Sequence, residues 1–240
     1  MERREKGYNT KEDWEASGVR TWKDYVWLYN NVVKHYKSLK PIDKVLDIGC
    51  GHGYFLDCCV KNGYAPSNLY GIEGEPDTLV IVKAKGYQIS SIDLEKDKLP
   101  YEDNSFSVVI CAQLIEHITH DAGANLLHEI YRVLKKDGML IIYSPSYFNV
   151  GCRTMPFHIY CWKPNEMRDE LKRAGFKNLI TKINTLKWWD LKKYDEKWHQ
   201  AKYKKKLNLA EKLLEYAVYT LYLITKWQRL LGQSAFVAYK

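Results

Sequence analysis

The chain is 240 residues long and carries 37 Lys and Arg against 29 Asp and Glu, so its formal net charge is +8. That length can bury a sizeable core, and 46% hydrophobic with 28% charged residues excludes a disordered chain, a collagen-like repeat and a polytopic membrane protein. A basic balance suggests nucleic acid, an anionic membrane or an acidic substrate, without choosing among them.

The charge is unevenly spread along the chain. Residues 1–40 carry 9 basic and 6 acidic side chains, residues 41–150 carry 9 and 15, and residues 151–240 carry 19 and 8. The middle segment is therefore acidic, with a net charge of −6, whereas the flanks are basic, at +3 and +11. This asymmetry predicts different roles for the middle and the flanks.

The first element expected is an N-terminal aromatic helical cap over residues 1–40, which includes Trp14, Trp22 and Tyr25. Short apolar runs then alternate with segments of helical periodicity. The predicted strands are Lys44–Ile48, Asn68–Glu73, Tyr87–Ile92, Ser105–Ala112, Met139–Ser144, Phe176–Asn184 and Ala235–Tyr239. The predicted helices are Tyr54–Asn62, Pro76–Lys85, Asp121–Lys135 and Lys163–Ala174. Such alternation predicts an α/β fold with a mostly parallel sheet and helices on both faces.

The core is therefore expected over residues 41–184, with residues 234–240 as its final strand. Residues 185–233 form a long insertion between the last two predicted strands, far longer than a simple connection. The first part of the insertion is rich in Lys and aromatic residues, and its second part, 207–231, is apolar and helical.

A glycine loop follows the first predicted strand, in the run from Val45 to Leu56 that reads VLDIGCGHGYFL. Gly49, Gly51 and Gly53 permit a tight turn and close approach of a ligand to the backbone at the start of a helix. The spacing is GxGxG, and Asp47 stands before it. An anion there would repel a pyrophosphate but suit a cationic ligand.

Further polar residues follow the next predicted strands, where α/β proteins bind ligands. Glu73 follows the second strand and can accept hydrogen bonds from a ribose diol, and Asp93 follows the third and can accept from an exocyclic amine. The fourth strand runs into Gln113, Glu116 and His117.

These motifs, together with the run LKKDGML from Leu134, resemble the class I S-adenosylmethionine-dependent methyltransferases of the type 11 branch, and are similar to ubiquinone-pathway O-methyltransferases. The resemblance covers about residues 44–184. It implies a Rossmann-like methyltransferase fold with a seven-stranded sheet whose last strand is antiparallel, and S-adenosyl-L-methionine as cofactor, with S-adenosyl-L-homocysteine as product. The cofactor-binding residues that it implies are Asp47, Gly49, Cys50, Gly51, Gly53, Glu73, Gly74, Asp93, Leu94 and Gln113.

The reaction implied is methyl transfer to a small or amphiphilic acceptor, at an oxygen. Such an acceptor carries its proton near neutral pH and needs a base, and His117 and His158 are the catalytic candidates. Aromatic residues of the flanks, among them Trp162, are candidates to wall the acceptor pocket.

Two alternatives remain at this point. The first is a metal-assisted RNA 2′-O-methyltransferase. The metal set of small-RNA 2′-O-methyltransferases is resembled by Gln113, Glu116, His117 and His158, with Gln113 in place of the first Glu. The second alternative is an interaction module that binds the cofactor without turnover. We expect no metal site.

The Lys-rich segment 186–206 has three interpretations: a solvated helix face, a nucleic-acid contact, or a contact with an anionic membrane surface. Residues 207–231 fit an interfacial helix, a dimer face or core packing.

The sequence favours a cytoplasmic protein, peripheral to the membrane at most. Its first ten residues carry five charges, and no run reaches the ~18 apolar residues of a spanning helix. The six cysteines include no CxxC pair, and Cys58 and Cys59 are adjacent. We therefore expect reduced thiols and no zinc site.

Overall fold

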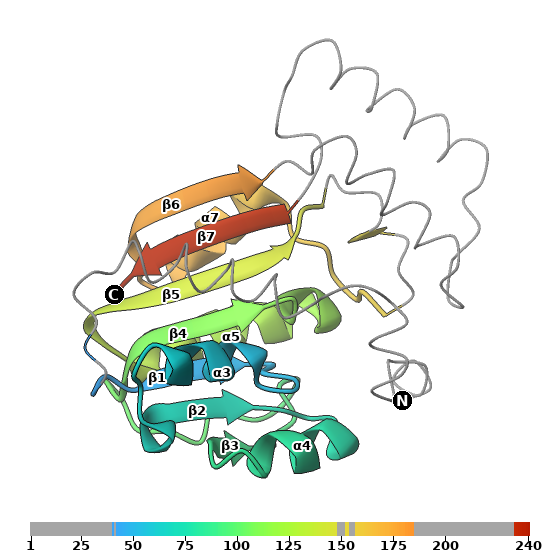
Figure 1. Cartoon of the computed structure of the whole chain (residues 1–240). Helices are drawn as coiled ribbons and strands as arrows, with labels where there is room; N and C mark the ends of the chain where they lie inside the picture. Colours follow the sequence, from blue (N-terminus) through green and yellow to red (C-terminus); the bar gives the residue numbers. More distant parts are fainter. Residues whose placement is uncertain (1–39, 41, 148–151, 154–156, 185–232) are drawn as a thin grey trace.

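A computed structural model describes residue 40 and residues 42–147, 152–153, 157–184 and 233–240 (Figure 1). The aromatic cap and most of the insertion, 185–232, lie outside the described residues, so the predictions for them stay predictions.

The described chain forms a seven-stranded sheet in the order β3-β2-β1-β4-β5-β7-β6. All neighbouring strands from β3 to β5 are parallel, whereas β7 runs antiparallel to both β5 and β6. The strands are β1 (Val45–Ile48), β2 (Leu69–Ile72), β3 (Gln88–Ser90), β4 (Phe106–Ala112), β5 (Leu134–Pro145), β6 (Lys177–Asn184) and β7 (Gln233–Tyr239). The mostly parallel sheet with an antiparallel last strand is therefore confirmed.

Helices cover both faces of this sheet, as predicted. The α-helices are α3 (Tyr54–Lys61), α4 (Pro76–Lys83), α5 (His120–Val133) and α7 (Pro164–Arg173), and two short 3₁₀ helices are η2 (Pro66–Asn68) and η3 (Ile115–His117). Figure 1 shows α3 on the near face of the sheet and α5 with α7 on the far face. Within the described residues, none of the helices has both the length and the apolar character needed to cross a bilayer.

Alternation along the strands explains why two cores form. Leu46 and Ile48 of β1 join the cluster that includes α5 and α7, whereas Val45 joins the cluster that includes α3. Successive side chains of a strand point to opposite faces, so a strand covered on both faces is mostly apolar; in β1 only Asp47 is charged. Each fully buried Leu or Ile contributes on the order of 1.5–3 kcal/mol to stability.

The predicted boundaries differ from the observed ones by one or two residues at most, except at the start of β5. The sequence predicts helix through Lys135, but α5 ends at Val133 and β5 already begins at Leu134. Leu134 adopts an extended backbone, is fully buried and pairs with Phe106. Burial of this one side chain beside β4 therefore ends the helix earlier than its periodicity indicates.

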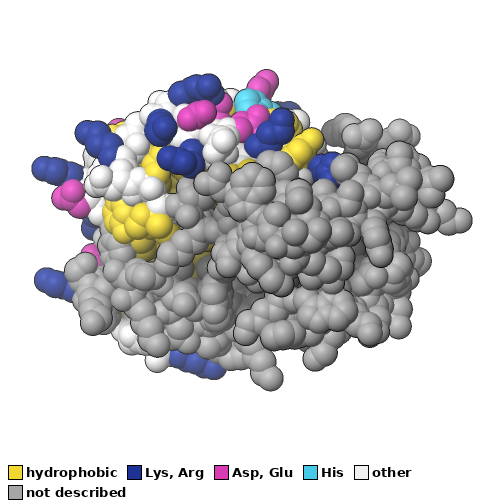
Figure 2. Space-filling view, turned by 90° about the horizontal axis from the view of Figure 1, so that it is seen from above, with side chains coloured by type: hydrophobic (Ala, Val, Ile, Leu, Met, Phe, Trp, Pro, Cys, Tyr) yellow, Lys and Arg dark blue, Asp and Glu magenta, His cyan; other side chains and the backbone are white. Residues whose placement is uncertain are grey.

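Charged side chains of both signs share the described surface. Figure 2 shows Lys and Arg side chains interleaved with Asp and Glu on the face it presents. On α7, for example, Lys172 lies 3.6 Å from Asp169, one turn away. This mixing is ordinary for a solvated surface, and much of the basic excess of the flanks falls in residues 1–39 and 185–232, which lie outside the described residues.

Candidate functional site

The glycine loop connects β1 to α3 and has the backbone conformation that glycine permits. Gly49, Gly51 and Gly53 have φ values of +74°, +52° and +76°, in the left-handed region that L side chains rarely adopt. A Cβ on Gly53 would lie 2.9 Å from Cγ2 of Val82, so this glycine also allows close packing. A Cβ on Gly51 would meet no atom of the described residues within 4 Å, so the loop borders space that these residues leave open.

Glu73 follows β2 and holds the loop in place. Its carboxylate accepts one hydrogen bond from the backbone N–H of Gly51 and another from that of Glu75, each 2.8 Å long. A Cβ on the neighbouring Gly74 would also meet no atom of the described chain within 4 Å. Sequence reasoning assigned Glu73 to a ribose diol and missed its contact with the loop, because the contact spans 22 residues and exists only once β1 and β2 are paired.

Negative charge is concentrated around this loop. Asp47 is buried in β1, with 3% of its surface exposed. Burial raises the pKa of the Cys50 thiol well above its usual value, and Asp47 and Glu73 raise it further. Burial likewise raises the pKa of Cys111 at the end of β4, with Glu116 and Asp47 adding to the effect. The same carboxylates that disfavour a thiolate here would stabilise a bound cation.

The remaining predicted cofactor residues follow β3 and β4, at the same edge of the sheet. The Asp93 carboxylate accepts from the backbone N–H of Glu95 and from Nζ of Lys96, both at 3.1 Å. Leu94 is partly buried against the core. Gln113 has φ +56° and donates its backbone N–H to the carbonyl of Tyr143 at 2.7 Å. Since β3, β2, β1 and β4 are neighbours in this order, their carboxyl ends bring these residues to one edge.

A second group lies just beyond Gln113. Glu116 and His117 belong to η3, and the main-chain oxygen of Glu116 accepts from the backbone N–H of Ile159 at 2.8 Å. This bond ties η3 to the segment that carries His158. One side-chain ligand atom each from Glu116, His117 and His158 lies within 4.8 Å of the others. The structure therefore brings both predicted catalytic histidines together, beside a carboxylate that is fully buried.

Backbone carbonyls orient both histidine rings. Nδ1 of His117 lies 3.1 Å from the carbonyl oxygen of Phe157, and Nδ1 of His158 lies 2.8 Å from that of Cys152. In a neutral ring that donates from Nδ1, the lone pair is on Nε2, so each ring would present Nε2 as its acceptor. Burial, followed by the nearby His117, lowers the pKa of His158 to about 3. His158 is therefore neutral over the physiological pH range.

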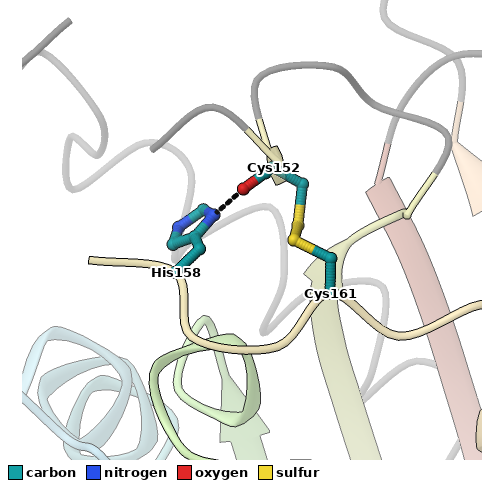
Figure 3. A group of neighbouring side chains, drawn as sticks. All are labelled: Cys152, His158 and Cys161. Atoms are coloured by element: carbon teal, nitrogen blue, oxygen red, sulfur yellow. Dashed lines mark hydrogen bonds between the residues drawn. A yellow bond between two sulfur atoms is a disulfide. The ribbon is translucent and has the colours of Figure 1, made fainter. Parts of the chain in front are cut away.

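The prediction of reduced thiols is wrong for two of the six cysteines. A disulfide joins Cys152 to Cys161, as Figure 3 shows, and their Cα atoms are 6.2 Å apart. The fold thus brings two residues nine positions apart within bonding reach. Cys50, Cys58, Cys59 and Cys111 are free and buried, as expected.

Trp162, one of the aromatic candidates for the acceptor pocket, lies in the core. It is 3% exposed, it lies in the core cluster with α5 and α7, and its indole N–H is 3.4 Å from the carbonyl oxygen of Ile115. The nearest ring to it is His120, which stacks on it with ring centroids 4.9 Å apart. The other aromatic candidates, Trp22 and Tyr25 among them, lie outside the described residues.

Comparisons with known proteins identify the class. A family model described as a methyltransferase domain, of the type 11 group, matches residues 46–142. A probable S-adenosylmethionine-dependent methyltransferase of Mycolicibacterium smegmatis is 29% identical over 136 residues, which are 55% of this chain and 51% of the relative. The ubiquinone/menaquinone biosynthesis C-methyltransferase UbiE of Burkholderia mallei is 28% identical over 140 residues, 56% of this chain and 54% of that protein.

The solved structures agree on the fold. The crystal structure of a SAM-dependent methyltransferase from Archaeoglobus fulgidus superposes with a TM-score of 0.64 at 18% identity, and covers 90% of this chain and 94% of that one. The chain spans about half the length of the curated relatives that it matches.

The fold and the glycine loop are those of the class I, Rossmann-like methyltransferases. Residues 46–142 match the type 11 methyltransferase domain, and the relatives described above include probable S-adenosylmethionine-dependent methyltransferases. The residues present fit this cofactor, because Gly51 and Gly74 border space that the described residues leave open and the carboxylates of Asp47 and Glu73 provide negative charge beside it.

Proposed function

We propose that this methyltransferase acts on a small or amphiphilic acceptor and places the methyl group on an oxygen, with His117 as the base. The observation that carries the proposal is the position of His117 beyond the end of β4, next to the cofactor edge, with its Nδ1 held by the carbonyl of Phe157. When bound, S-adenosylmethionine supplies an electrophilic methyl group on a sulfonium.

The residues of this chain would then have three tasks. Asp47, Glu73 and the glycine loop bind the cofactor. His117 orients the acceptor and takes its proton on Nε2, because an alcohol or phenol must lose a proton as its oxygen attacks. His158 is the weaker base, since its low pKa gives little driving force for taking a proton near neutral pH. It would instead help to position His117, whose ring centroid lies 4.9 Å from that of His158.

The test is transfer of a labelled methyl group from S-adenosylmethionine to matched phenols, long-chain alcohols, amines and enolisable carbon acids. We expect label on oxygen, and a His117→Gln variant that loses about 100-fold or more in kcat while its affinity for S-adenosylmethionine is unchanged. His120→Gln is the matched control, since it alters a histidine three positions away that packs on Trp162.

Label found on nitrogen or carbon would contradict the choice of oxygen; UbiE, by its name, methylates carbon. A His117→Gln variant that turns over normally would contradict the role of the base. Cofactor binding without transfer to any acceptor would favour the interaction module instead.

A second candidate is metal-assisted 2′-O-methylation of RNA. It is favoured by Glu116, His117 and His158, whose ligand atoms lie within 4.8 Å of one another. Two imidazoles and one carboxylate suit Mn²⁺, Fe²⁺ or Zn²⁺ better than Mg²⁺, and the metal would acidify a hydroxyl. Methylation of an RNA 3′ end that requires Mn²⁺, and that Glu116→Gln abolishes, would support this candidate over the first.

The flanks would supply the contacts with larger partners. We propose 207–231 as the segment that meets an anionic membrane surface or a second copy of the chain. Sedimentation with anionic and with neutral vesicles tests the membrane contact, and the mass of the free protein in solution tests the dimer. If the protein neither binds vesicles nor dimerises, core packing is the remaining interpretation of this segment.

A further inference from the structure

Cys152, His158 and Cys161 form a compact group within ten residues of chain. One sulfur from each cysteine and one ring nitrogen of His158 lie within 4.8 Å of one another. Cys152 is 1% exposed, and His158 and Cys161 are partly buried. The sequence did not reveal this group as a metal set because it lacks a CxxC pair, and the three side chains come together only in the folded protein (Figure 3).

The bridge decides what this group can bind. As a disulfide, the two sulfurs carry no thiolate and are poor ligands. A dithiol reductant would supply two electrons: the S–S bond breaks, each sulfur takes one proton, and the dithiol is oxidised to its own disulfide. The product has two thiols and an imidazole, and this soft to borderline donor set suits Zn²⁺ with one coordination position left open.

Charge favours the same ion. Binding of Zn²⁺ would release the two thiol protons, and two thiolates with one Zn²⁺ form a neutral group, which a partly buried site tolerates better than a net charge. The Nδ1 edge of the His158 ring faces Cys152 (Figure 3), so ligation through Nδ1 would replace its 2.8 Å hydrogen bond to the carbonyl and leave the proton on Nε2.

We propose that Cys152, His158 and Cys161 form a Zn²⁺ site that exists only when the Cys152–Cys161 bridge is reduced. The site would replace our expectation from the sequence that the chain holds no metal. It does not rest on the proposed methyl acceptor, because metal binding can be measured without acceptor or cofactor. His158 also belongs to the Glu116–His117–His158 group, so a metal in one set competes with a metal in the other.

The experiment compares the oxidised and reduced forms of the full chain without S-adenosylmethionine. The protein is reduced with a dithiol, freed of reductant without oxygen, and titrated with Co²⁺ and then with Zn²⁺ against a chromophoric chelator. We expect the reduced form to bind one Zn²⁺ and to show thiolate-to-Co²⁺ charge-transfer absorption. The oxidised form should lose this absorption and bind Zn²⁺ at least about 100-fold more weakly, since loss of even an outer partner costs up to about that much.

Variants locate the metal. Cys152→Ser and Cys161→Ser should each lose the charge-transfer band, and His158→Asn should weaken binding of Zn²⁺ by the reduced form. Cys58→Ser/Cys59→Ser is the matched control, because these are buried free thiols elsewhere, and Glu116→Gln tests the competing set. Both controls should keep the band.

Three outcomes would overturn the proposal: equal binding by the oxidised and reduced forms, loss of the band in Cys58→Ser/Cys59→Ser, or binding that depends on Glu116 and survives loss of both Cys152 and Cys161. The comparison of redox forms uses one sequence, so the proposal stays testable if a cysteine variant fails to fold. Failure here would leave methyl transfer unaffected, and failure of methyl transfer would leave this titration unchanged.

Discussion

Two regions of this molecule are built in different ways: the cofactor edge, which is the glycine loop with Glu73, and the proposed acceptor side, which is Glu116 and His117 of η3 with His158. At the cofactor edge, a glycine loop and a carboxylate from the next strand hold each other through the bond from Gly51 to Glu73. On the acceptor side, η3 meets a segment about forty residues further along the chain, and backbone carbonyls of that segment orient the histidines. The cofactor edge is fixed by neighbouring strands, and the acceptor side by contacts between segments about forty residues apart in the sequence.

Because of this difference, the two regions should tolerate different changes. The loop between β1 and α3 tolerates few substitutions, because its glycines have positive φ values at which other residues would be strained. The acceptor side depends on the segment 157–161 and on a bridge that can be reduced. Variants that damage one side while leaving the other intact are therefore the most informative tests.

The largest effect is expected for Glu73→Ala. The variant loses two charge-assisted hydrogen bonds, one from the loop at Gly51 and one from the backbone N–H of Glu75, each worth about 1.5–3 kcal/mol, together with the acid assigned to the ribose. We expect affinity for S-adenosylmethionine, measured by calorimetry, to fall about 100-fold or more. Asp77→Ala removes an exposed carboxylate from the first turn of α4 and should bind normally. An equal loss in both variants would mean that general electrostatics, and not the Glu73 contacts, dominates.

A smaller effect, divided between stability and binding, is expected from two glycine variants. Gly53→Ala puts a Cβ 2.9 Å from Val82 at φ +76°, and should lower the free energy of unfolding by ~2–4 kcal/mol. Gly51→Ala meets no neighbour within 4 Å among the described residues and should cost only ~1–2 kcal/mol from its backbone conformation.

The same pair should rank in the opposite order for the cofactor. The Cβ of Gly51→Ala would enter the open space that we assign to the ligand, so this variant should lose cofactor affinity while it remains well folded. Denaturant unfolding and calorimetry on both variants check the two orders. Normal cofactor binding by Gly51→Ala would contradict the placement of the ligand at the loop.

The sequence predicted the fold because its signals are local. Val45, Leu46 and Ile48 are apolar because β1 is buried on both faces, with the acidic Asp47 between them, and the glycine loop follows at once. Glu73 was found in the same way, as an acid at a strand end. The start of β5 was not, because Leu134 is extended by its burial against Phe106, a tertiary effect that no periodicity contains.

The acceptor side was predicted only as a set of residue types. Glu116, His117 and His158 were identified, but neither their approach nor the carbonyls that orient the rings could be read from spacing. The Cys152–Cys161 bridge was missed for the same reason: two cysteines nine positions apart bond only where the fold brings them together. Contacts that depend on long-range packing are thus the part that sequence reasoning lacked.

The smallest effect is expected at a network outside both regions. The Glu129 carboxylate accepts from Arg132 at 2.7 Å and from the backbone N–H of Leu99 at 3.0 Å, and Arg132 also donates to the carbonyl of Tyr101. The hydrogen bond from Arg132 lowers the pKa of Glu129 in the folded state, against the opposing effect of burial. The ionised carboxylate therefore stabilises the fold above its unfolded pKa of about 4.5, and this contribution is lost as pH falls through the folded pKa.

Glu129→Gln should accordingly cost about 1–2 kcal/mol at pH 7, and the difference from the wild-type protein should shrink below about pH 4.5. Denaturant unfolding at a series of pH values measures this difference. Affinity for S-adenosylmethionine and kcat should stay normal, which makes the variant a standard for what lost stability alone does to either side. A difference that grows as pH falls would reverse the sign of the linkage and contradict the role of the Arg132 contact.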